Sequence, residues 1–335
     1  MKDCNKDIRN YHKDRVVLNS KQRTNLRERR NANRERLQRG LKANEKPLPK
    51  EFVIQGSYQA KTTIQEPNNA YDIDDGAVFL LEELKGPQGG DMTPLDAKKM
   101  VRDAVDDDSF KTSPEVKTNC VRVHYDDGSH VDIPVYRKKV QEDETELFEI
   151  ASASWRESNP KGVNRWFDDR LDLRGNDGRD QMRELIRLLK AYCKHRPSYS
   201  LPSGFVLTML VDEKYWIYNE RLDQAFRDLI KEIRDRLIIS KLVRHPVVNE
   251  NLAEANDPKC VKLQELLTTS LKQLEVLDRT NCLRSEALKA WKKVFNTDYF
   301  DQSIADAETD EKKAARAALA SIAVMPKPYA SENEH

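Results

Sequence analysis

The sequence has 335 residues, of which 34% are charged and 38% are hydrophobic, and its 58 Lys and Arg residues nearly balance its 57 Asp and Glu residues to give a formal charge of +1. This balance excludes a uniformly basic nucleic-acid coat and a uniformly acidic disordered chain. The length exceeds that of most single hydrophobic cores, so it allows two domains or one large one.

The apolar runs are short. The best of them, residues 204–211, falls far below the roughly 20 residues that cross a bilayer. The first residues show no apolar stretch behind their positive charges, so we expect no secretory signal peptide and no membrane span. The five cysteines are widely spaced, and none of the six histidines stands at a metal-ligand spacing from another. These features predict a cytoplasmic protein with free thiols and without a structural zinc.

The first 50 residues are strongly basic, with 16 Lys and Arg against 6 Asp and Glu. We predict a long polar helix from Ser20, as its N-cap, to about Lys42, where glycine and proline residues supply stop signals. Its apolar stripe is thin and consists of Leu26, Leu37 and Leu41. Two interpretations remain open: a solvated helix on the outside of a lobe, or a basic surface for nucleotide or nucleic acid.

Residues 50–140 have a mixed α+β pattern. Apolar residues predict strands at 52–55 and 71–81, and Thr93 followed by Pro94 predicts a helix to Val105. Two further strands, 120–125 and 130–136, flank a turn with the sequence Asp-Asp-Gly-Ser, which is a strong hairpin signal.

After the acidic stretch 141–146 the pattern becomes helical almost to the end. Apolar residues share one helical face in each of four segments, 182–192, 222–237, 263–274 and 283–294. The sequence therefore predicts a mixed sheet domain followed by a helical one, with ligands bound in the cleft between them.

Three aspartates in strand patterns form the most informative group. In a strand, residues i and i+2 project from the same face, so Asp72 and Asp74 present two carboxylates together while Ile73 enters the core. Asp132, between Val131 and Ile133, repeats this arrangement. Three adjacent carboxylates raise one another's pKa or recruit a cation. Oxygen ligands suit Mg²⁺ or Mn²⁺, and two such ions stabilise the attacking and leaving oxygens of a phosphoryl displacement.

A Gly-Ser pair precedes these aspartates. Gly56 lets the backbone approach a ligand closely, and Ser57 offers a hydroxyl and an N–H group to phosphate oxygens at a turn that leads into a helix. A lone Gly-Ser pair is weak evidence for a phosphate-binding turn. A Gly-Ser pair followed by a strand Asp-x-Asp and a further strand aspartate is much stronger evidence.

The segments 55–62, 72–76 and 130–136 together resemble the nucleotidyltransferases of the polymerase-beta-like superfamily that include cyclic GMP-AMP synthase, oligoadenylate synthetase and the bacterial CD-NTases. The first two segments look most like the bacterial enzymes. The resemblance implies an α+β fold in which a polymerase-beta-like core and a C-terminal helical lobe flank a central cleft. It divides the chain into a basic N-terminal helix packing on the outside of the lobes (1–45), the catalytic core (46–155), the helical lobe (156–324) and a flexible tail (325–335).

The resemblance also implies site residues. Asp72, Asp74 and Asp132 match the catalytic carboxylates that bind two Mg²⁺ or Mn²⁺ ions, and Asp132 also helps to activate the attacking ribose hydroxyl. The nucleotide-binding positions that it implies are Gln55, Gly56, Ser57, Lys190 and Ser203. Lys194 and Ser200 are close competitors for the last two, and Ala60 is small where some relatives have an aromatic residue.

The function that the resemblance implies is synthesis of a cyclic oligonucleotide, a cyclic dinucleotide such as cyclic GMP-AMP, from ATP or GTP with release of pyrophosphate. The product would be a second messenger in bacterial antiphage (CBASS) signalling, received by a separate effector protein, and a regulatory partner protein is a further option. No zinc insertion is present, so we expect no DNA requirement. Two alternatives stay open: nucleotidyl transfer to RNA or protein, and an inactive nucleotide-binding or scaffold protein.

Other conspicuous residues have simpler interpretations. Asp75 should face away from its neighbours and bind a turn or a helix end, and His124 and His130 are expected to be exposed cross-strand partners. We assign Trp155, Trp166 and Trp291 to helical core positions, and we do not assign base stacking to Tyr58 or Tyr71.

Overall fold

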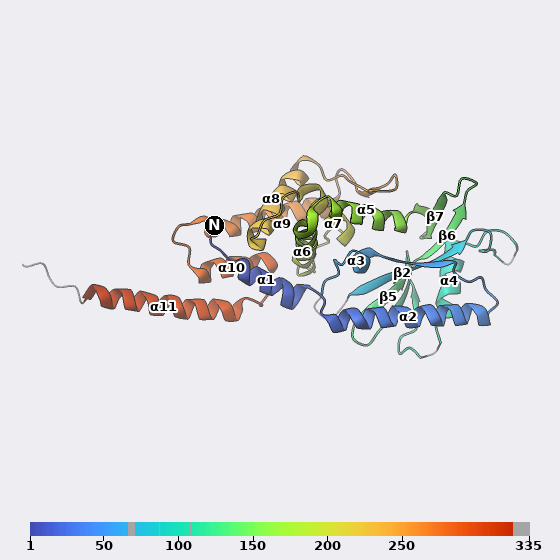
Figure 1. Ribbon diagram of the computed structural model, residues 1–335, viewed down its shortest axis with the longest axis horizontal. Coiled ribbons are helices and arrows are strands. Elements are labelled where there is room, and N and C mark those ends of the chain that lie inside the picture. Colours follow the sequence, from blue (N-terminus) through green and yellow to red (C-terminus); the bar gives the residue numbers. More distant parts are fainter. Residues whose placement is uncertain (66–70, 87, 108, 324–335) are drawn as a thin grey trace, which may run out of the picture.

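The computed structural model describes residues 1–65, 71–86, 88–107 and 109–323. A mixed β-sheet with its covering helices forms one part of the molecule, and most of the remaining helices form the other (Figure 1). The expected α+β fold is confirmed. The predicted tail at 325–335 lies outside the described residues.

Among the described residues, eight strands form one sheet in the order β3-β4-β5-β2-β6-β7-β8, with β1 paired to β2. β2 runs parallel to β5 and β6, whereas the other pairs are antiparallel. The strands are β1 (Glu51–Gln55), β2 (Asp72–Leu80), β3 (Glu115–Val116), β4 (Val121–His124), β5 (His130–Ile133), β6 (Val135–Val140), β7 (Glu146–Ala151) and β8 (Trp155–Ser158).

The prediction that the chain becomes helical after residues 141–146 is wrong, because β7 and β8 continue the sheet there. In β7 the residues alternate, so that Phe148 and Ile150 are buried while Glu149 pairs across the strands with Arg137 of β6. Trp155 is accordingly a strand residue and not a helical one. Its indole N–H donates to the carbonyl oxygen of Met92 at 2.9 Å.

The long N-terminal helix, α2 (Ser20–Ala43), begins one residue earlier than predicted, because Ser20 is its first helical residue and not its N-cap. Asn19 is the N-cap: its side chain accepts from the Gln22 N–H at 2.9 Å, and the Gln22 side chain accepts from the Asn19 N–H at 2.8 Å. The apolar stripe of α2 is fully buried and packs with α4 (Pro94–Val105) and the sheet.

Several arginines of α2 form ion pairs with acids of the core. Arg29 pairs with Asp127, and Arg36 and Arg39 pair with Asp107. These contacts favour the interpretation of α2 as a covering helix, because they tie part of its positive charge to acids of the sheet part.

The helices that follow the sheet are α5 (Pro160–Asp172), α6 (Gly175–Lys194), α7 (Gly204–Lys214), α8 (Leu222–Ile239), α9 (Pro258–Leu274), α10 (Arg284–Phe295) and α11 (Asp301–Ala323), which projects from the rest of the molecule in Figure 1. Of these, α6, α8, α9 and α10 correspond to the four predicted segments, whereas α5, α7 and α11 were not predicted as separate segments. Between α8 and α9, β9 (Val243–Arg244) and β10 (Asn251–Ala253) form a small hairpin, and a short 3-10 helix, η3 (Glu275–Asp278), follows α9.

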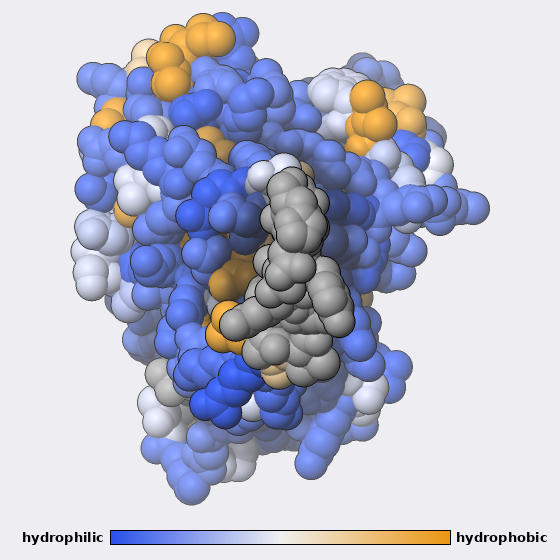
Figure 2. Space-filling view, turned by 90° about the vertical axis from the view of Figure 1, so that its left-hand side faces the viewer, coloured by the Kyte–Doolittle hydropathy of each residue, from blue (hydrophilic) through white to orange (hydrophobic). Residues whose placement is uncertain are grey.

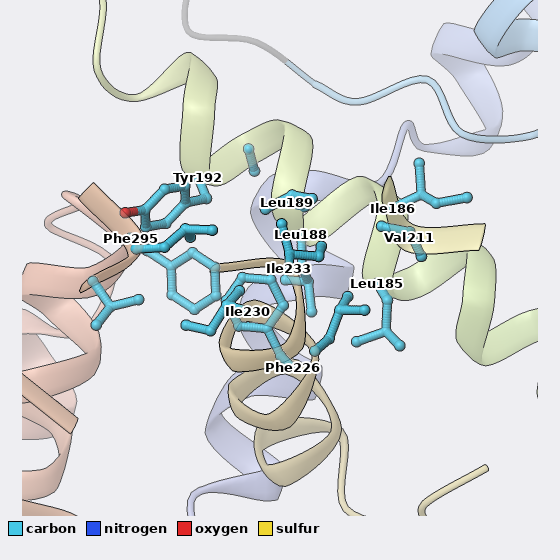
Figure 3. Packing of buried hydrophobic residues seen from close by; sticks show 14 of the residues in the cluster. Leu185, Ile186, Leu188, Leu189, Tyr192, Val211, Phe226, Ile230, Ile233 and Phe295 are labelled. Carbon is cyan, nitrogen blue, oxygen red and sulfur yellow. The ribbon is translucent and has the colours of Figure 1, made fainter. Parts of the chain in front are cut away.

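The core of the helical part is built from apolar faces of α6, α8 and α10 (Figure 3). Phe226 of α8 and Phe295 of α10 stack with their ring centroids 5.1 Å apart. The first residues of the chain also enter this core, although no pattern in the sequence predicts it. In α1 (Asn5–Tyr11) and the π-helical turn η1 (His12–Val16), Ile8 and Tyr11 are fully buried, and Tyr11 lies 4.7 Å from Phe295 between ring centroids.

The face that the molecule presents at its α11 end is mostly hydrophilic, with small hydrophobic areas (Figure 2). No described helix combines the length and apolar character that crossing a membrane requires. All five cysteines are free, as expected from their spacing, and all five are buried.

Candidate active site

Four polar side chains come together where β2 and β5 run side by side. In this parallel pair, Asp72 is the partner of His130 and Asp74 is the partner of Asp132. The intervening Ile73 and Val131 are fully buried. Because side chains alternate along a strand, the two aspartates of β2 and the two polar residues of β5 share the opposite face.

Asp72, His130 and Asp132 form the tightest group. Each offers one ligand atom, and these atoms lie within 4.8 Å of one another. Asp132 is buried, and both of its oxygens accept hydrogen bonds from Arg122, its cross-strand partner on β4: Nε donates to Oδ1 at 2.8 Å and Nη2 donates to Oδ2 at 2.7 Å. Asp74 lies next to this group and faces the Gly56 turn.

The electrostatics of this group favour a cation. Burial, followed by the charge of Asp132, raises the pKa of Asp72, and burial together with Asp72 and Asp132 raises the pKa of Asp74 well above its ordinary value. Such raised values mean that the ionised carboxylates repel one another in a poorly solvated place. A few carboxylate oxygens at the mouth of a cleft are the ligands that Mg²⁺ and Mn²⁺ take, so the donor set fits a divalent cation.

The predicted Gly-Ser turn lies directly over Asp74. β1 ends at Gln55, and the short helix α3 (Gly56–Gln59) follows, as expected from the sequence. Gly56 has φ +66°, and a Cβ atom there would lie 2.2 Å from Oδ2 of Asp74. The Ser57 hydroxyl is hydrogen-bonded to that of Thr63 at 2.9 Å, and Gln55 accepts from the Tyr136 hydroxyl at 2.9 Å.

Lys190 and Ser203 approach the turn from the helical side. Lys190 is buried, and its ammonium group donates to the carbonyl oxygen of Thr62 at 3.2 Å and to its hydroxyl at 3.0 Å. Burial lowers the pKa of Lys190 to about 8, although the charge of Asp72 acts in the opposite direction. Ser203 caps α7 by accepting from the N–H of Val206 at 3.3 Å.

These residues line a cleft with two hollows. The larger, of about 840 Å³, contains Asp72, Asp74, Arg122 and His130. The smaller, of about 260 Å³, lies beside the Gly-Ser turn, and its lining includes the aromatic side chains of Tyr136, Trp166, Phe167 and Phe205. Both hollows are lined by Ser57, Thr62, Lys190 and Gly204.

The competing candidates differ in their positions. Lys194 and Ser203 line the larger hollow, whereas Ser200 is exposed and does not line either hollow. Trp166, expected in the core, is only partly buried there and also lines the smaller hollow, while Trp291 is fully buried as predicted.

His130 is the cross-strand partner of His124, as predicted, but its side chain is half-buried rather than exposed and belongs to the carboxylate group. The signal that could have found it is its spacing of two residues from Asp132, which repeats the spacing of Asp72 and Asp74. His124 is a cross-strand partner as expected, and its ring is 2.7 Å from a Glu115 oxygen.

Asp75 faces away from this group, as predicted, but its partner is neither a turn nor a helix end. Arg34 of α2 donates to both of its oxygens, from Nε at 2.6 Å and from Nη2 at 2.5 Å.

Comparison with known proteins gives this geometry a family context. Residues 50–136, which hold the Gly-Ser turn and all three aspartates, match the family model described as cyclic GMP-AMP synthase DncV-like, nucleotidyltransferase domain. The chain contains a DncV-like nucleotidyltransferase domain. This segment covers β1 to β5 and the start of β6.

Solved structures extend the likeness over nearly the whole chain of this nucleotidyltransferase. The CD-NTase CdnG of Bradyrhizobium diazoefficiens, in complex with GTP, has 15% sequence identity and a TM-score of 0.70, and the match covers 91% of this chain and 99% of that one. DncV of Escherichia coli, bound to 3'-deoxy GTP, has 16% identity and a TM-score of 0.69, with 90% and 98% covered. For Vibrio cholerae DncV, a cyclic AMP-GMP synthase in complex with nonhydrolyzable GTP, the values are 16%, 0.68, 87% and 94%. The solved structures therefore share the fold of this chain over most of its length, and the domain match covers the segment that holds the three aspartates.

Proposed function

We propose that this nucleotidyltransferase is a cyclic oligonucleotide synthase that joins ATP, GTP or both into a cyclic dinucleotide, with release of pyrophosphate at each transfer. The observation that carries the proposal is the convergence of Asp72, Asp74 and Asp132 on one face of the sheet, under the Gly-Ser turn. The relatives described as a cyclic AMP-GMP synthase and as GTP complexes support the choice of substrates.

In this proposal the three aspartates hold two divalent cations, Mg²⁺ or Mn²⁺. The cations, when bound, neutralise the charge that develops on the attacking and leaving oxygens. Asp132 also accepts a hydrogen bond from the attacking ribose hydroxyl and so orients it toward the donor phosphate. Arg122 fixes the plane of the Asp132 carboxylate through two hydrogen bonds, which leaves the other lone pairs of that group free for these contacts.

The donor triphosphate lies between the two parts of the molecule. The backbone N–H and hydroxyl of Ser57 bind phosphate oxygens from the core, and Lys190 and Ser203 bind them from the helical side. Gln55 holds the turn in place through the Tyr136 hydroxyl. The larger hollow is of the size of small-molecule sites, which supports binding of nucleotides there.

The domain division that we propose is the one expected from the sequence, with the catalytic core at 46–155 and the helical lobe at 156–324, except that β8 continues the sheet to Ser158 and residues 5–16 pack with the helical lobe. After the first transfer the linear product turns in the cleft, so that the former donor presents its ribose hydroxyl as the acceptor. The cyclic product is a second messenger for an effector protein in antiphage signalling, in the cytoplasm.

Product analysis tests this function directly. We expect the protein, incubated with the four ribonucleoside triphosphates and Mg²⁺ or Mn²⁺ but no polymer, to release pyrophosphate and to form a cyclic oligonucleotide identified by mass spectrometry and nuclease digestion. Asp132→Ala should form none, because it loses a cation ligand. If labelled triphosphates transferred their label only to added RNA or protein, nucleotidyl transfer to a macromolecule would be the favoured function. A protein inactive under all these conditions would favour a nucleotide-binding scaffold.

The charge of Lys190 gives a second prediction. Because burial lowers the pKa of Lys190 to about 8, the nucleotide-free protein loses this positive charge as the pH rises through that value. We expect the affinity for a nonhydrolysable ATP analogue, measured by calorimetry, to fall about tenfold between pH 7 and pH 9. Lys190→Met should bind weakly at both pH values and show little of this fall.

Lys194→Met is the matched control, since Lys194 lies one helical turn further along α6 and also lines the larger hollow. It should keep the pH dependence of the wild type. If Lys194→Met lost the pH dependence while Lys190→Met kept it, the assignment of the triphosphate lysine would have to be reversed.

A further inference from the structure

One polar side chain of the cleft has no part in the function proposed above. His130 lies beside Asp72 across the parallel strands and two residues before Asp132 on the same strand face. It is half-buried and lines the larger hollow. Its position is therefore inside the carboxylate group and not at its edge.

The ring of His130 is available for a ligand. On the neighbouring strand, Nε2 of His124 is hydrogen-bonded to Oε1 of Glu115 at 2.7 Å. The ring of His130 has no hydrogen-bond partner within the described part of the chain, and its contact with His124 is one of ring packing, with centroids 6.2 Å apart. A ring nitrogen of His130 thus remains open toward the cleft.

The distances fit a shared cation. One ring nitrogen of His130 and one oxygen each of Asp72 and Asp132 lie within 4.8 Å of one another. Bonds of about 2.2 Å to one ion would bring two such ligand atoms to at most roughly 4.4 Å. Small side-chain rotations are enough to close the remaining difference.

The charge of the group also favours a neutral ligand at this point. Arg122 offsets one of the three negative charges of the aspartates, and the other two remain to be balanced by cations. An imidazole adds a bond to the ion without adding charge. A fourth carboxylate in its place would increase the repulsion that already raises the pKa of Asp72.

We propose that His130 is a nitrogen ligand of the divalent cation that Asp72 and Asp132 hold, and that it biases this position toward Mn²⁺ over Mg²⁺. The inference rests on the proposed function, because it concerns the same metal-binding group. Mg²⁺ binds oxygen ligands and keeps several waters, whereas imidazole suits transition-metal ions better, and Mn²⁺ accepts carboxylates as well. His130 would therefore be a determinant of metal choice.

Direct binding of Mn²⁺ to the nucleotide-free protein tests this proposal without any catalytic step. In the wild type we expect pulsed electron paramagnetic resonance of bound Mn²⁺ to show hyperfine coupling to a nitrogen nucleus. His130→Asn should lose this coupling, because it offers an amide oxygen instead. Its Mn²⁺ affinity should fall about tenfold, while its Mg²⁺ affinity, measured by competition, should change less than threefold.

His124→Asn is the matched control, because it changes the neighbouring histidine on the same face without touching the carboxylate group. It should keep both the nitrogen coupling and the wild-type affinities. Thermal melting in metal-free buffer checks that each variant is folded, and His130→Gln replaces His130→Asn if the latter is not.

A wild type without nitrogen coupling, or coupling that persists in both His130 variants, would overturn the proposal. Equal losses of Mn²⁺ and Mg²⁺ affinity would overturn the metal preference. Pyrophosphate release by a wild type that lacks the coupling would leave the proposed function intact and remove this inference alone. Nitrogen coupling in a wild type that transfers no nucleotide under any condition would contradict the proposed function and leave the inference on His130 intact.

Discussion

Replacing Asp74 with asparagine is expected to lower nucleotidyl transfer at least about 1,000-fold and, at the same time, to stabilise the metal-free protein. The loss of activity follows from the loss of a cation ligand, which supplies several kcal/mol of transition-state stabilisation. The gain in stability follows from the raised pKa of Asp74, which has burial as its main cause and the charges of Asp72 and Asp132 as further causes.

The sign of the pH effect follows from that raised pKa. The folded state binds the proton of Asp74 more tightly than the unfolded chain does, so ionisation of this group disfavours folding. As the pH rises above the ordinary value of 3.8, the metal-free wild type should therefore lose free energy of unfolding relative to Asp74→Asn. Denaturant unfolding at pH 4 and pH 7 measures this difference. Mg²⁺ should raise the melting temperature of the wild type more than that of the variant.

Asp75→Asn is the control for this experiment, because Asp75 is the next residue but lies on the opposite face and pairs with Arg34. It should keep its activity and lose about 2–4 kcal/mol of stability, since it breaks a pair whose carboxylate is buried. Equal activities of Asp74→Asn and the wild type would contradict the metal-binding role of Asp74.

The second large effect is expected for Gly56→Ala. At φ +66° a residue with a side chain is strained by about 1–2 kcal/mol, and the added Cβ would come within 2.2 Å of the Asp74 carboxylate. Either the turn or Asp74 has to move. A displacement of about 1 Å in a catalytic group costs on the order of 100-fold, so we expect kcat to fall by at least that factor.

Gly175→Ala separates strain from displacement. Gly175 has nearly the same backbone conformation, φ +65°, but nothing lies within 4 Å of the added Cβ. It should lose a similar amount of stability and keep its activity. If both variants kept the wild-type kcat, the close approach of the turn to Asp74 would not matter for the reaction.

The sequence predicts that the three aspartates share one strand face, because that depends on a local pattern. Alternation along β2 and β5 puts Asp72, Asp74 and Asp132 on one face once these strands are neighbours, but their parallel pairing is a long-range contact that no local pattern specifies. The glycine requirement at residue 56 also follows from a local turn. The roles of these residues in catalysis remain predictions until variants are measured.

The failures occurred where distant contacts decide the structure. The first helix has few apolar residues, but Ile8 and Tyr11 fill a space between helices that lie more than 170 residues further along the chain. β7 was missed because its alternation is short and its pairing with β6 determines its conformation. The spacing of two residues from Asp132 places His130 on the face of the aspartates, but only the pairing of β5 with β2 brings it next to Asp72.

The course of the N-terminal segment restricts how the cleft can open. Residues up to Val16 pack with α6 and α8 of the helical part, whereas α2 packs with α4 and the sheet. The chain therefore passes between the two parts twice, once just after Val16 and again between β8 and α5. Because two segments of the chain join the parts, the easiest relative motion is a rotation about the line through these segments. Twisting of one part on the other is opposed. The walls of the cleft should accordingly open and close by a hinge rotation about this line.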